Sequence, residues 1–332
     1  MDVGIINNGY LMVELFFVLS GFVIFNAYSS KINSPKDLLR FQFLRFGRLY
    51  PVHIIFLFVF LAIEIVKYIA ALKFQMRNQG SIPFAINNLN TFIQNIFLFQ
   101  SVLPNQPFSY NQPAWSISVE FYTYLVFGFI VLFFQRFKIY IFSAIGVLCF
   151  VVLIADASPG SESLLLCFLG FFIGCLTAYL SDTTKIVLPN YLPILVFLSI
   201  ILFLEIKTSK KFDLAIFFLT SALIFSLILS KGGILKKLLN FKLFTWLGMI
   251  SYSLYMSHSA VLYVVNQFIR YILRRPEVVG VDGKSVPQLN DMDTLIACVL
   301  VVALVLLVSQ IVYYLVEKPW RDKSRRFTFE KM

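Results

Sequence analysis

The chain contains repeated runs of about 20 mostly apolar residues, the length that an α-helix needs to cross a bilayer. Only 14% of its 332 residues are charged, whereas a soluble domain carries about 25%. Inside lipid the backbone polar groups must bond within the protein, which favours helices for these runs. The sequence therefore predicts an all-α polytopic membrane protein that forms one integral-membrane domain over residues 1–332.

Nine runs are predicted to span the membrane. They cover residues 11–28, 51–72, 115–134, 139–155, 164–180, 190–206, 212–229, 247–269 and 294–316. In residues 82–102 the apolar positions recur every three or four residues, which is typical of an amphipathic helix lying in the interface.

The formal net charge of +11 could suggest a nucleic-acid partner, but the basic residues lie in short loops between apolar runs. That pattern indicates topology signalling and contact with lipid headgroups, and no nucleic acid is expected. Most Lys and Arg residues fall in the loop set 29–50, 135–138, 181–189, 230–243 and 317–332. This set is predicted to be cytoplasmic, so the C-terminus is inside. Nine spans then place the N-terminus outside, and we expect that a tenth helix once preceded Met1.

Glu120 lies inside an otherwise apolar run, in the segment Trp-Ser-Ile-Ser-Val-Glu over residues 115–120. A charged side chain at the bilayer centre costs about 2.5–3.5 kcal/mol on insertion scales, so such a residue is expected to have a partner or a task. Arg45 and Arg48 stand at the mouth of another apolar run, residues 51–72. Their spacing puts them on one face if the segment is helical, and guanidinium groups suit phosphate oxygens. The simpler interpretation is a headgroup anchor.

The four cysteines fall in or beside apolar runs and are predicted to be buried; they are Cys149, Cys167, Cys175 and Cys298. Their spacing indicates neither a disulfide framework nor a zinc site, and no metal is expected. Of the two histidines, His53 is interpreted as an interfacial or core residue, whereas His258 lies within a predicted span.

Five segments together resemble the acyltransferase-3 family of membrane O-acyltransferases. They are Asn8–Phe22, Arg45–Pro51, Trp115–Glu120, Gly248–His258 and Tyr314–Arg321. The resemblance covers essentially the whole chain, in the expected order. It implies a fold of ten transmembrane helices whose first helix carries a histidine regarded as catalytic. Nothing in this sequence matches that first helix, so the chain looks N-terminally truncated relative to the family.

The resemblance also implies roles for individual residues. Arg45 and Arg48 would bind the donor acetyl-CoA, and Glu120 would be catalytic. Trp115 would contact the substrate, by stacking on a sugar or by lining the acyl path, or it would anchor the chain in the aromatic belt. Glu14, where the family commonly has Asp, is a second substrate-binding candidate.

Three further residues complete the sequence-based assignments. His258 would be the substitute base if the chain is active without an upstream helix. Ser20 is interpreted as a helix-packing residue. Glu317 is expected to fix a helix end or to pair with a nearby Arg.

The predicted function is an acyltransferase of the bacterial inner membrane. It would move acetyl from acetyl-CoA to a hydroxyl of a cell-surface or lipid-linked glycan, with membrane lipids around it. Two alternatives remain open at this stage. One is a transporter or flippase for an anionic or glycan-linked lipid, and the other is a non-catalytic remnant of the family.

Overall fold

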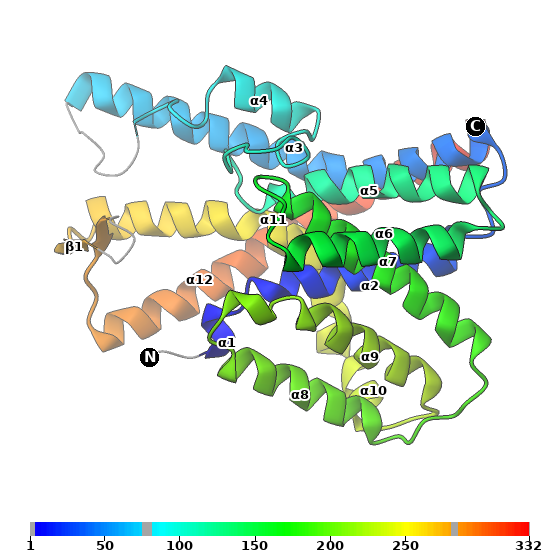
Figure 1. The fold of residues 1–332 in the computed structure, drawn as a ribbon. Helices are drawn as coiled ribbons and strands as arrows, with labels where there is room; N and C mark the ends of the chain where they lie inside the picture. Colours follow the sequence, from blue (N-terminus) through cyan, green and yellow to red (C-terminus); the bar gives the residue numbers. More distant parts are fainter. Residues whose placement is uncertain (1–3, 75–81, 280–284, 332) are drawn as a thin grey trace.

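The computed structural model describes residues 4–74, 82–279 and 285–331, and nearly all of its regular structure is helical. The elements in chain order are α1 (Gly4–Asn7), α2 (Leu11–Tyr28), α3 (Pro35–Phe74), α4 (Leu89–Ile96), α5 (Ala114–Phe133), α6 (Lys138–Ile154), α7 (Glu162–Thr183), α8 (Leu192–Ile206), the 3₁₀ turn η1 (Lys210–Phe212), α9 (Ala215–Leu229), α10 (Ile234–Leu239), α11 (Lys242–Tyr271), β1 (Glu277–Val279), β2 (Ser285–Pro287), α12 (Asp291–Val312), the π-helical turn η2 (Tyr313–Glu317) and α13 (Lys318–Lys331). Most of the long helices run side by side, with α1 and the end of α13 at opposite ends of the bundle (Figure 1).

Each of the nine predicted runs is helical, which confirms the all-α membrane fold class. Among the described residues, five helices are long and apolar enough to cross a bilayer; they cover Leu11–Tyr28, Pro35–Lys73, Ala114–Phe133, Glu162–Thr183 and Asp291–Thr328. The helices α6, α8 and α9 are apolar but shorter. The count of nine spans stays a prediction.

Loops predicted to share a membrane face contact each other. The Lys138 ammonium donates to the carbonyl of Ser29 (2.8 Å), which joins the α5–α6 and α2–α3 connections. At the other end, the Asn105 amide donates to the carbonyl of Gly160 (3.1 Å), which joins the α4–α5 and α6–α7 connections. In both contacts the two loops were predicted to lie on the same side of the membrane, and the structure places them at the same end of the bundle. Which end is cytoplasmic stays a prediction.

Helix α3 begins well before the predicted start of its span at residue 51. Its 40 residues correspond to about 60 Å, roughly twice the hydrocarbon core. The start is set locally: Ser34 Oγ accepts from the Asp37 amide (3.2 Å) and donates to the Asp37 carboxylate (2.7 Å), with Pro35 at the first helical position. Residues 35–50 were predicted as a loop and are helical instead. Pro51, which was expected near the start of the span, lies inside the helix.

Within residues 82–102 only Leu89–Ile96 forms a regular helix, α4. Its apolar residues Leu89 and Ile93 are exposed, whereas the polar Thr91 and Asn95 are buried. The apolar side therefore faces outward, as expected of a helix at the interface. The helix is confirmed for α4, and the prediction is wrong for the rest of the stretch, where turns interrupt the helical period. The position of α4 in the interface stays a prediction.

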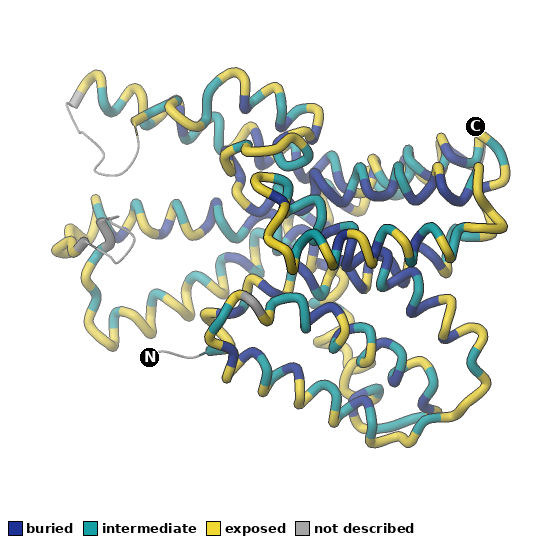
Figure 2. Tube along the Cα trace, viewed as in Figure 1, coloured by how far each residue is buried: buried dark blue, intermediate teal, exposed yellow. Residues whose placement is uncertain are grey.

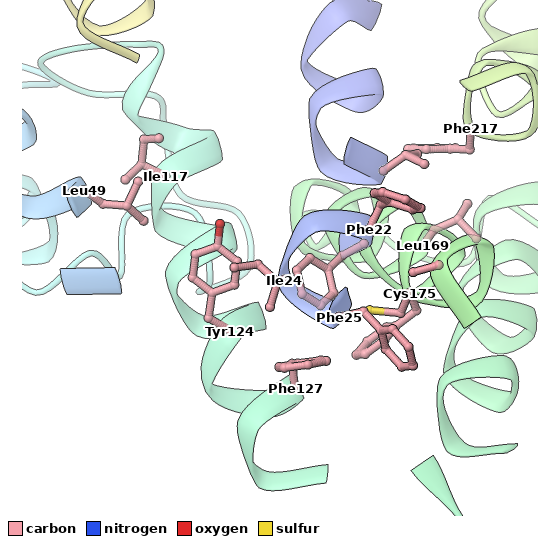
Figure 3. Packing of buried hydrophobic residues seen from close by; sticks show 14 of the residues in the cluster. Phe22, Ile24, Phe25, Leu49, Ile117, Tyr124, Phe127, Leu169, Cys175 and Phe217 are labelled. Atoms are coloured by element: carbon pink, nitrogen blue, oxygen red, sulfur yellow. The ribbon is translucent and has the colours of Figure 1, made fainter. Parts of the chain in front are cut away.

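The densest packing lies where α2 crosses α7, and buried residues gather around α2, α5 and α7 (Figure 2). A Cβ at Gly21 would lie 1.9 Å from the carbonyl oxygen of Phe171, so only glycine permits this helix approach. Beside it, Phe127 and Phe142 stack with ring centroids 5.7 Å apart (Figure 3 shows Phe127 among its neighbours). This core fixes the relative positions of α2 and α5.

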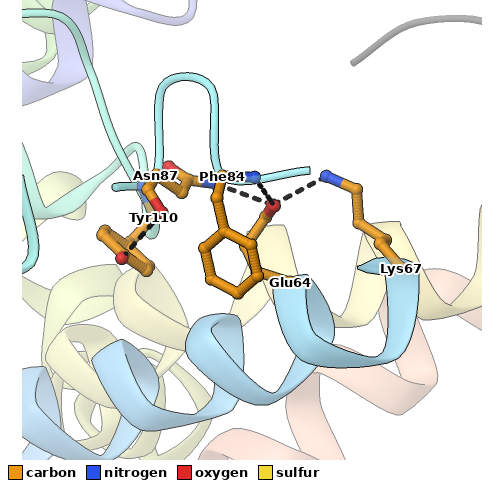
Figure 4. A network of polar contacts seen from close by, with 5 residues as sticks. All are labelled: Glu64, Lys67, Phe84, Asn87 and Tyr110. Atoms are coloured by element: carbon orange, nitrogen blue, oxygen red, sulfur yellow. Dashed lines mark hydrogen bonds and ion pairs between the residues drawn. The ribbon is translucent and has the colours of Figure 1, made fainter. Parts of the chain in front are cut away.

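A second anchor holds the chain that leads into α5 (Figure 4). The buried Glu64 carboxylate of α3 accepts hydrogen bonds from Lys67 (2.6 Å), the Phe84 amide (3.1 Å) and Asn87 (2.8 Å). The Asn87 carbonyl in turn accepts from the Tyr110 hydroxyl (2.9 Å). The network ties both ends of the α4 region to α3 and thereby sets where α5 begins.

The cysteine prediction is correct for three residues and wrong for one. Cys149, Cys167 and Cys175 are buried, whereas Cys298 is exposed on α12; all four are free thiols. Cys298 lies in an apolar segment whose outer side meets lipid, where burial inside the protein is not required.

Candidate active site

One cavity of about 830 Å³ joins the residues that the sequence singled out at separate positions. Its wall comes from α2, α3, α5, α11 and the two residues before each of α2 and α5. The lining includes the predicted site residues Arg45, Arg48, Trp115, Glu120 and His258. The volume lies within the range of small-molecule sites.

Helix α2 contributes a stripe at helical spacing to this cavity: Met12, Phe16, Leu19 and Val23. All four are partly exposed, which is consistent with an open wall. The stripe extends over about 16 Å along the helix axis, more than half the thickness of a hydrocarbon core. The cavity is therefore elongated along the helix bundle and is not a shallow surface depression.

Glu120 is held by two hydroxyl groups and keeps one oxygen free. Its Oε1 accepts from Ser20 Oγ (2.7 Å) and from the Tyr124 hydroxyl, and the two hydroxyl oxygens lie 2.8 Å apart. The side chain is 1% exposed, and its Oε2 has no hydrogen-bond partner among the described residues. A buried carboxylate with one oriented and one unused oxygen can receive a proton at a fixed point.

The two arginines differ in their contacts. The Arg45 guanidinium packs over the rings of Tyr28 (5.2 Å) and Tyr124 (6.0 Å) and donates to the Tyr28 hydroxyl (3.1 Å). Arg48 lies one turn further and is exposed; the described residues offer it no carboxylate within 4 Å. Arg48 is therefore the more exposed of the two toward an incoming anion, whereas Arg45 is held against aromatic rings, donates one hydrogen bond and has an Nε without a partner among the described residues.

The α11 wall carries His258 in a defined tautomer. Its Nδ1 lies 2.6 Å from the carbonyl oxygen of Tyr255, which can only accept, so Nδ1 carries the proton. When the ring carries only this proton, Nε2 is an acceptor, and it lies 3.4 Å from Ser259 Oγ. The Tyr255 hydroxyl bridges α11 to α5 by donating to the carbonyl of Pro113 (2.9 Å) and accepting from Ser116 Oγ (3.0 Å).

These contacts establish an order along the cavity. Ser116 lies one turn before Glu120 on α5, and its partner Tyr255 lies one turn before His258 on α11. Arg45 approaches Glu120 from the opposite direction, through Tyr124. The order of these groups is therefore Arg45, then Glu120, then His258, and Arg48 lines the same cavity one helical turn after Arg45.

Trp115 lines the cavity near its His258 end, where its ring meets Phe17 edge-on (5.9 Å) and Phe108 at a tilt (6.3 Å). The ring is partly exposed, so both sequence-based roles, a stacking surface for a sugar and a wall of the acyl path, fit its position.

Glu14 lies apart from this arrangement and does not line the cavity. It is buried near the Lys207–Asp213 ion pair, whose Nζ–Oδ1 distance is 2.5 Å. Burial disfavours the Lys207 ammonium, but hydrogen bonds and the charge of Asp213 outweigh it and raise the pKa of Lys207. Tyr10 joins the pair by donating to Asp213 (2.8 Å). Glu14 thus faces a cluster that fixes the start of α2 to the α8–α9 connection.

Two other residues behave as structural groups. His53 is 1% exposed, and its Nε2 lies 2.9 Å from the carbonyl oxygen of Asn95, as expected of a core histidine. Glu317 is buried in the π-helical turn and accepts from Ser253 Oγ (2.7 Å), which joins this turn to α11. Of the two expected roles, fixing a helix end agrees with this place in the turn, whereas no arginine lies within 4 Å of the Glu317 carboxylate among the described residues.

Sequence reasoning missed Ser20 and Tyr124 as partners of Glu120. Tyr124 could have been found, because it follows Glu120 by four residues and the two therefore share a helix face. Ser20 was interpreted as a packing residue, and its contact with Glu120 comes from the crossing of α2 and α5, which no local pattern reveals.

Comparison with known proteins identifies the family of the chain. A family model described as "Acyltransferase domain" (Acyl_transf_3) matches residues 2–314. The chain belongs to the acyltransferase-3 family. It is also 31% identical over 123 residues to "Protein 2 in picA locus" of Rhizobium radiobacter, an alignment that covers 34% of this chain and 61% of that protein. The chain thus spans about three fifths of that relative. No solved structure matches the chain significantly.

Proposed function

We propose that the protein transfers an acetyl group from acetyl-CoA to a hydroxyl of a cell-surface or lipid-linked glycan at the bacterial inner membrane. Family membership supports acyl transfer at a membrane. The observation that carries the finer proposal is the single cavity that joins two arginines, a buried carboxylate and a histidine. Each of these groups matches a separate requirement of the reaction.

The donor requirement is met at the arginine end. Coenzyme A carries several phosphate groups, and guanidinium donors bind phosphate oxygens well. Arg48 would contact them directly because it is the more exposed of the two, while Arg45 would hold Tyr124 and add positive charge. This end is the one predicted to face the cytoplasm, where acetyl-CoA is made, so the C-terminus would be cytoplasmic as well.

The chemical step would occur beside Glu120. The acceptor hydroxyl gives its proton to Glu120 Oε2 while its oxygen attacks the thioester carbon. The carbon–sulfur bond then breaks, and the leaving thiolate of coenzyme A takes the proton from Glu120, which restores the carboxylate. The products are an O-acetyl ester and free coenzyme A, and every atom of the two substrates is accounted for. Ser20 and Tyr124 would keep Oε2 aimed at the hydroxyl by fixing Oε1.

The acceptor requirement is met at the other end of the cavity. His258 Nε2 can accept a hydrogen bond from a neighbouring hydroxyl of the sugar, and the Trp115 ring offers an aromatic face beside it. A sugar held by both groups would present one of its hydroxyls toward Glu120. His258 is therefore assigned to the acceptor, one step away from the proton transfer itself.

The test uses the purified protein in vesicles that contain glycan extracted from bacterial membranes. We expect radiolabelled acetyl to move from acetyl-CoA into the glycan fraction, and acetyl-CoA to raise the thermal stability of the protein as a bound ligand must. S-acetylpantetheine without the nucleotide phosphates should stabilise the protein much less. Absence of both labelling and stabilisation at saturating acetyl-CoA would refute the proposal and favour a transporter or an inactive relative.

A further inference from the structure

A second cavity, of about 530 Å³, lies between α3 and α13 and is separate from the site described above. Its lining is Phe43, Phe46, Gly47, Tyr50, Pro51, Ile54, Ile55, Trp320, Lys323, Ser324 and Phe327. Arg45, Arg48 and Leu49, on another side of α3, face the first cavity instead. Helix α3 therefore separates two cavities, and this one, which we call the α3–α13 groove, has no part in the proposed reaction.

The wall of the α3–α13 groove is almost entirely apolar. Phe46 stacks on Tyr50 (centroids 4.3 Å), and Phe43 meets Phe327 across the two helices (5.4 Å). The hydroxyl of Ser324 is already used, because it donates to the carbonyl of Arg321 (2.9 Å). The groove thus offers a surface for hydrocarbon and very few sites for hydrogen bonding.

The helices meet closely at one point. A Cβ at Gly47 would lie 2.5 Å from the side chain of Ser324, so α3 packs directly against that side chain. Further along, Ile55 and Trp320 remain 37% and 50% exposed although they line the groove. These apolar side chains are open to an occupant that reaches the groove from the surrounding bilayer.

One cation stands at the rim. Lys323 is exposed, and its ammonium lies over the Trp320 ring at 5.0 Å, which holds the charge beside the apolar surface. Arg326, three residues later, is also exposed but does not line the groove. The nearest acidic neighbour in sequence, Asp322, lies 4.0 Å from the Arg321 guanidinium and is balanced by it. The rim therefore carries net positive charge.

We infer that the α3–α13 groove binds an anionic glycerophospholipid, with an acyl chain on the Phe and Ile side chains and the headgroup phosphate on Lys323. An apolar channel with a cation at its edge complements both parts of such a lipid. Basic pockets between membrane helices are known to hold anionic headgroups. A soluble anion would gain nothing from the apolar wall, and a zwitterionic lipid would gain less from the cation.

Trp320 permits a direct test, since the chain has only three tryptophans. In a protein carrying Trp115→Phe and Trp246→Phe, the remaining fluorescence reports on the groove. The probes are vesicles containing brominated phosphatidylglycerol or brominated phosphatidylcholine at equal bromine content. We expect stronger quenching by phosphatidylglycerol, and Lys323→Ala should weaken its apparent affinity about fivefold, the factor for one cation near an anionic surface.

Arg325→Ala provides the matched control, because it removes the same charge from α13 on a side away from the groove. This variant should keep the preference for phosphatidylglycerol. Native mass spectrometry repeats the comparison in the chain that keeps all three tryptophans. There Lys323→Ala and Arg325→Ala are each introduced alone, and the bound lipid is weighed directly. Equal quenching by the two lipids, or equal losses in Lys323→Ala and Arg325→Ala, would overturn the inference.

Discussion

Removal of the Tyr124 hydroxyl should slow acyl transfer without weakening donor binding. Tyr124 is 5% exposed, and its hydroxyl contacts both Glu120 Oε1 and Ser20 Oγ. Tyr124→Phe keeps the ring against which Arg45 packs and removes only the hydroxyl. A hydrogen bond to a charged group contributes about 1.5–3 kcal/mol. If that amount is lost from the transition state, kcat falls about tenfold to a hundredfold while the KM for acetyl-CoA stays within about twofold.

The assay is the initial rate of acetyl transfer from radiolabelled acetyl-CoA into the glycan fraction, measured over a range of acetyl-CoA concentrations. Tyr122→Phe is the matched control, since it removes a hydroxyl from the same helix that donates instead to the carbonyl of Phe97 (2.8 Å). That variant should retain the wild-type kcat. Equal rates in Tyr124→Phe and Tyr122→Phe would refute the positioning of Glu120 by Tyr124.

Three further predictions concern other parts of the molecule. Arg48→Ala should raise the KM for acetyl-CoA at least tenfold, whereas Arg40→Ala, whose guanidinium lies near Asp37 outside the cavity, should leave it unchanged; a rise in both would contradict a specific donor contact. Gly21→Ala should prevent stable folding because its Cβ would overlap the α7 backbone, while Gly146→Ala, with open space around it, should be neutral or stabilising by about 0.5–1 kcal/mol in chemical unfolding. Glu64→Gln should lower the free energy of unfolding by about 3 kcal/mol because it leaves the Lys67 ammonium unpaired in a buried place, and an unchanged unfolding curve would show that the network does not anchor the α4 region.

The membrane fold could be predicted because hydrophobic length is a strong signal, and each predicted run is a helix. The start of α3 was missed because its first half is charged, although the Ser34–Asp37 capping pattern and Pro35 marked that start. Hydropathy describes the part of a helix inside lipid and says little about the part that continues into water.

For the site, sequence motifs brought Arg45, Arg48, Trp115, Glu120 and His258 forward, and one cavity contains all five. The sequence could not show that Arg45 is held against aromatic rings while Arg48 is exposed, because that depends on the crossing of α2, α3 and α5. Glu14 illustrates the same limit. Glu14 belongs to a motif on α2, which does line the cavity. Its side chain, however, lies near Lys207 and Asp213 between α8 and α9, so the motif alone did not place it in the cavity.

The most direct test of the central role of Glu120 compares two isosteric changes at buried glutamates, Glu120→Gln and Glu14→Gln. Both side chains are buried, but only Glu120 lines the cavity. We expect Glu120→Gln to reduce acetyl transfer to background while acetyl-CoA still stabilises the protein, and Glu14→Gln to transfer at close to the wild-type rate. Wild-type transfer by Glu120→Gln would contradict the assignment of this carboxylate as the proton acceptor.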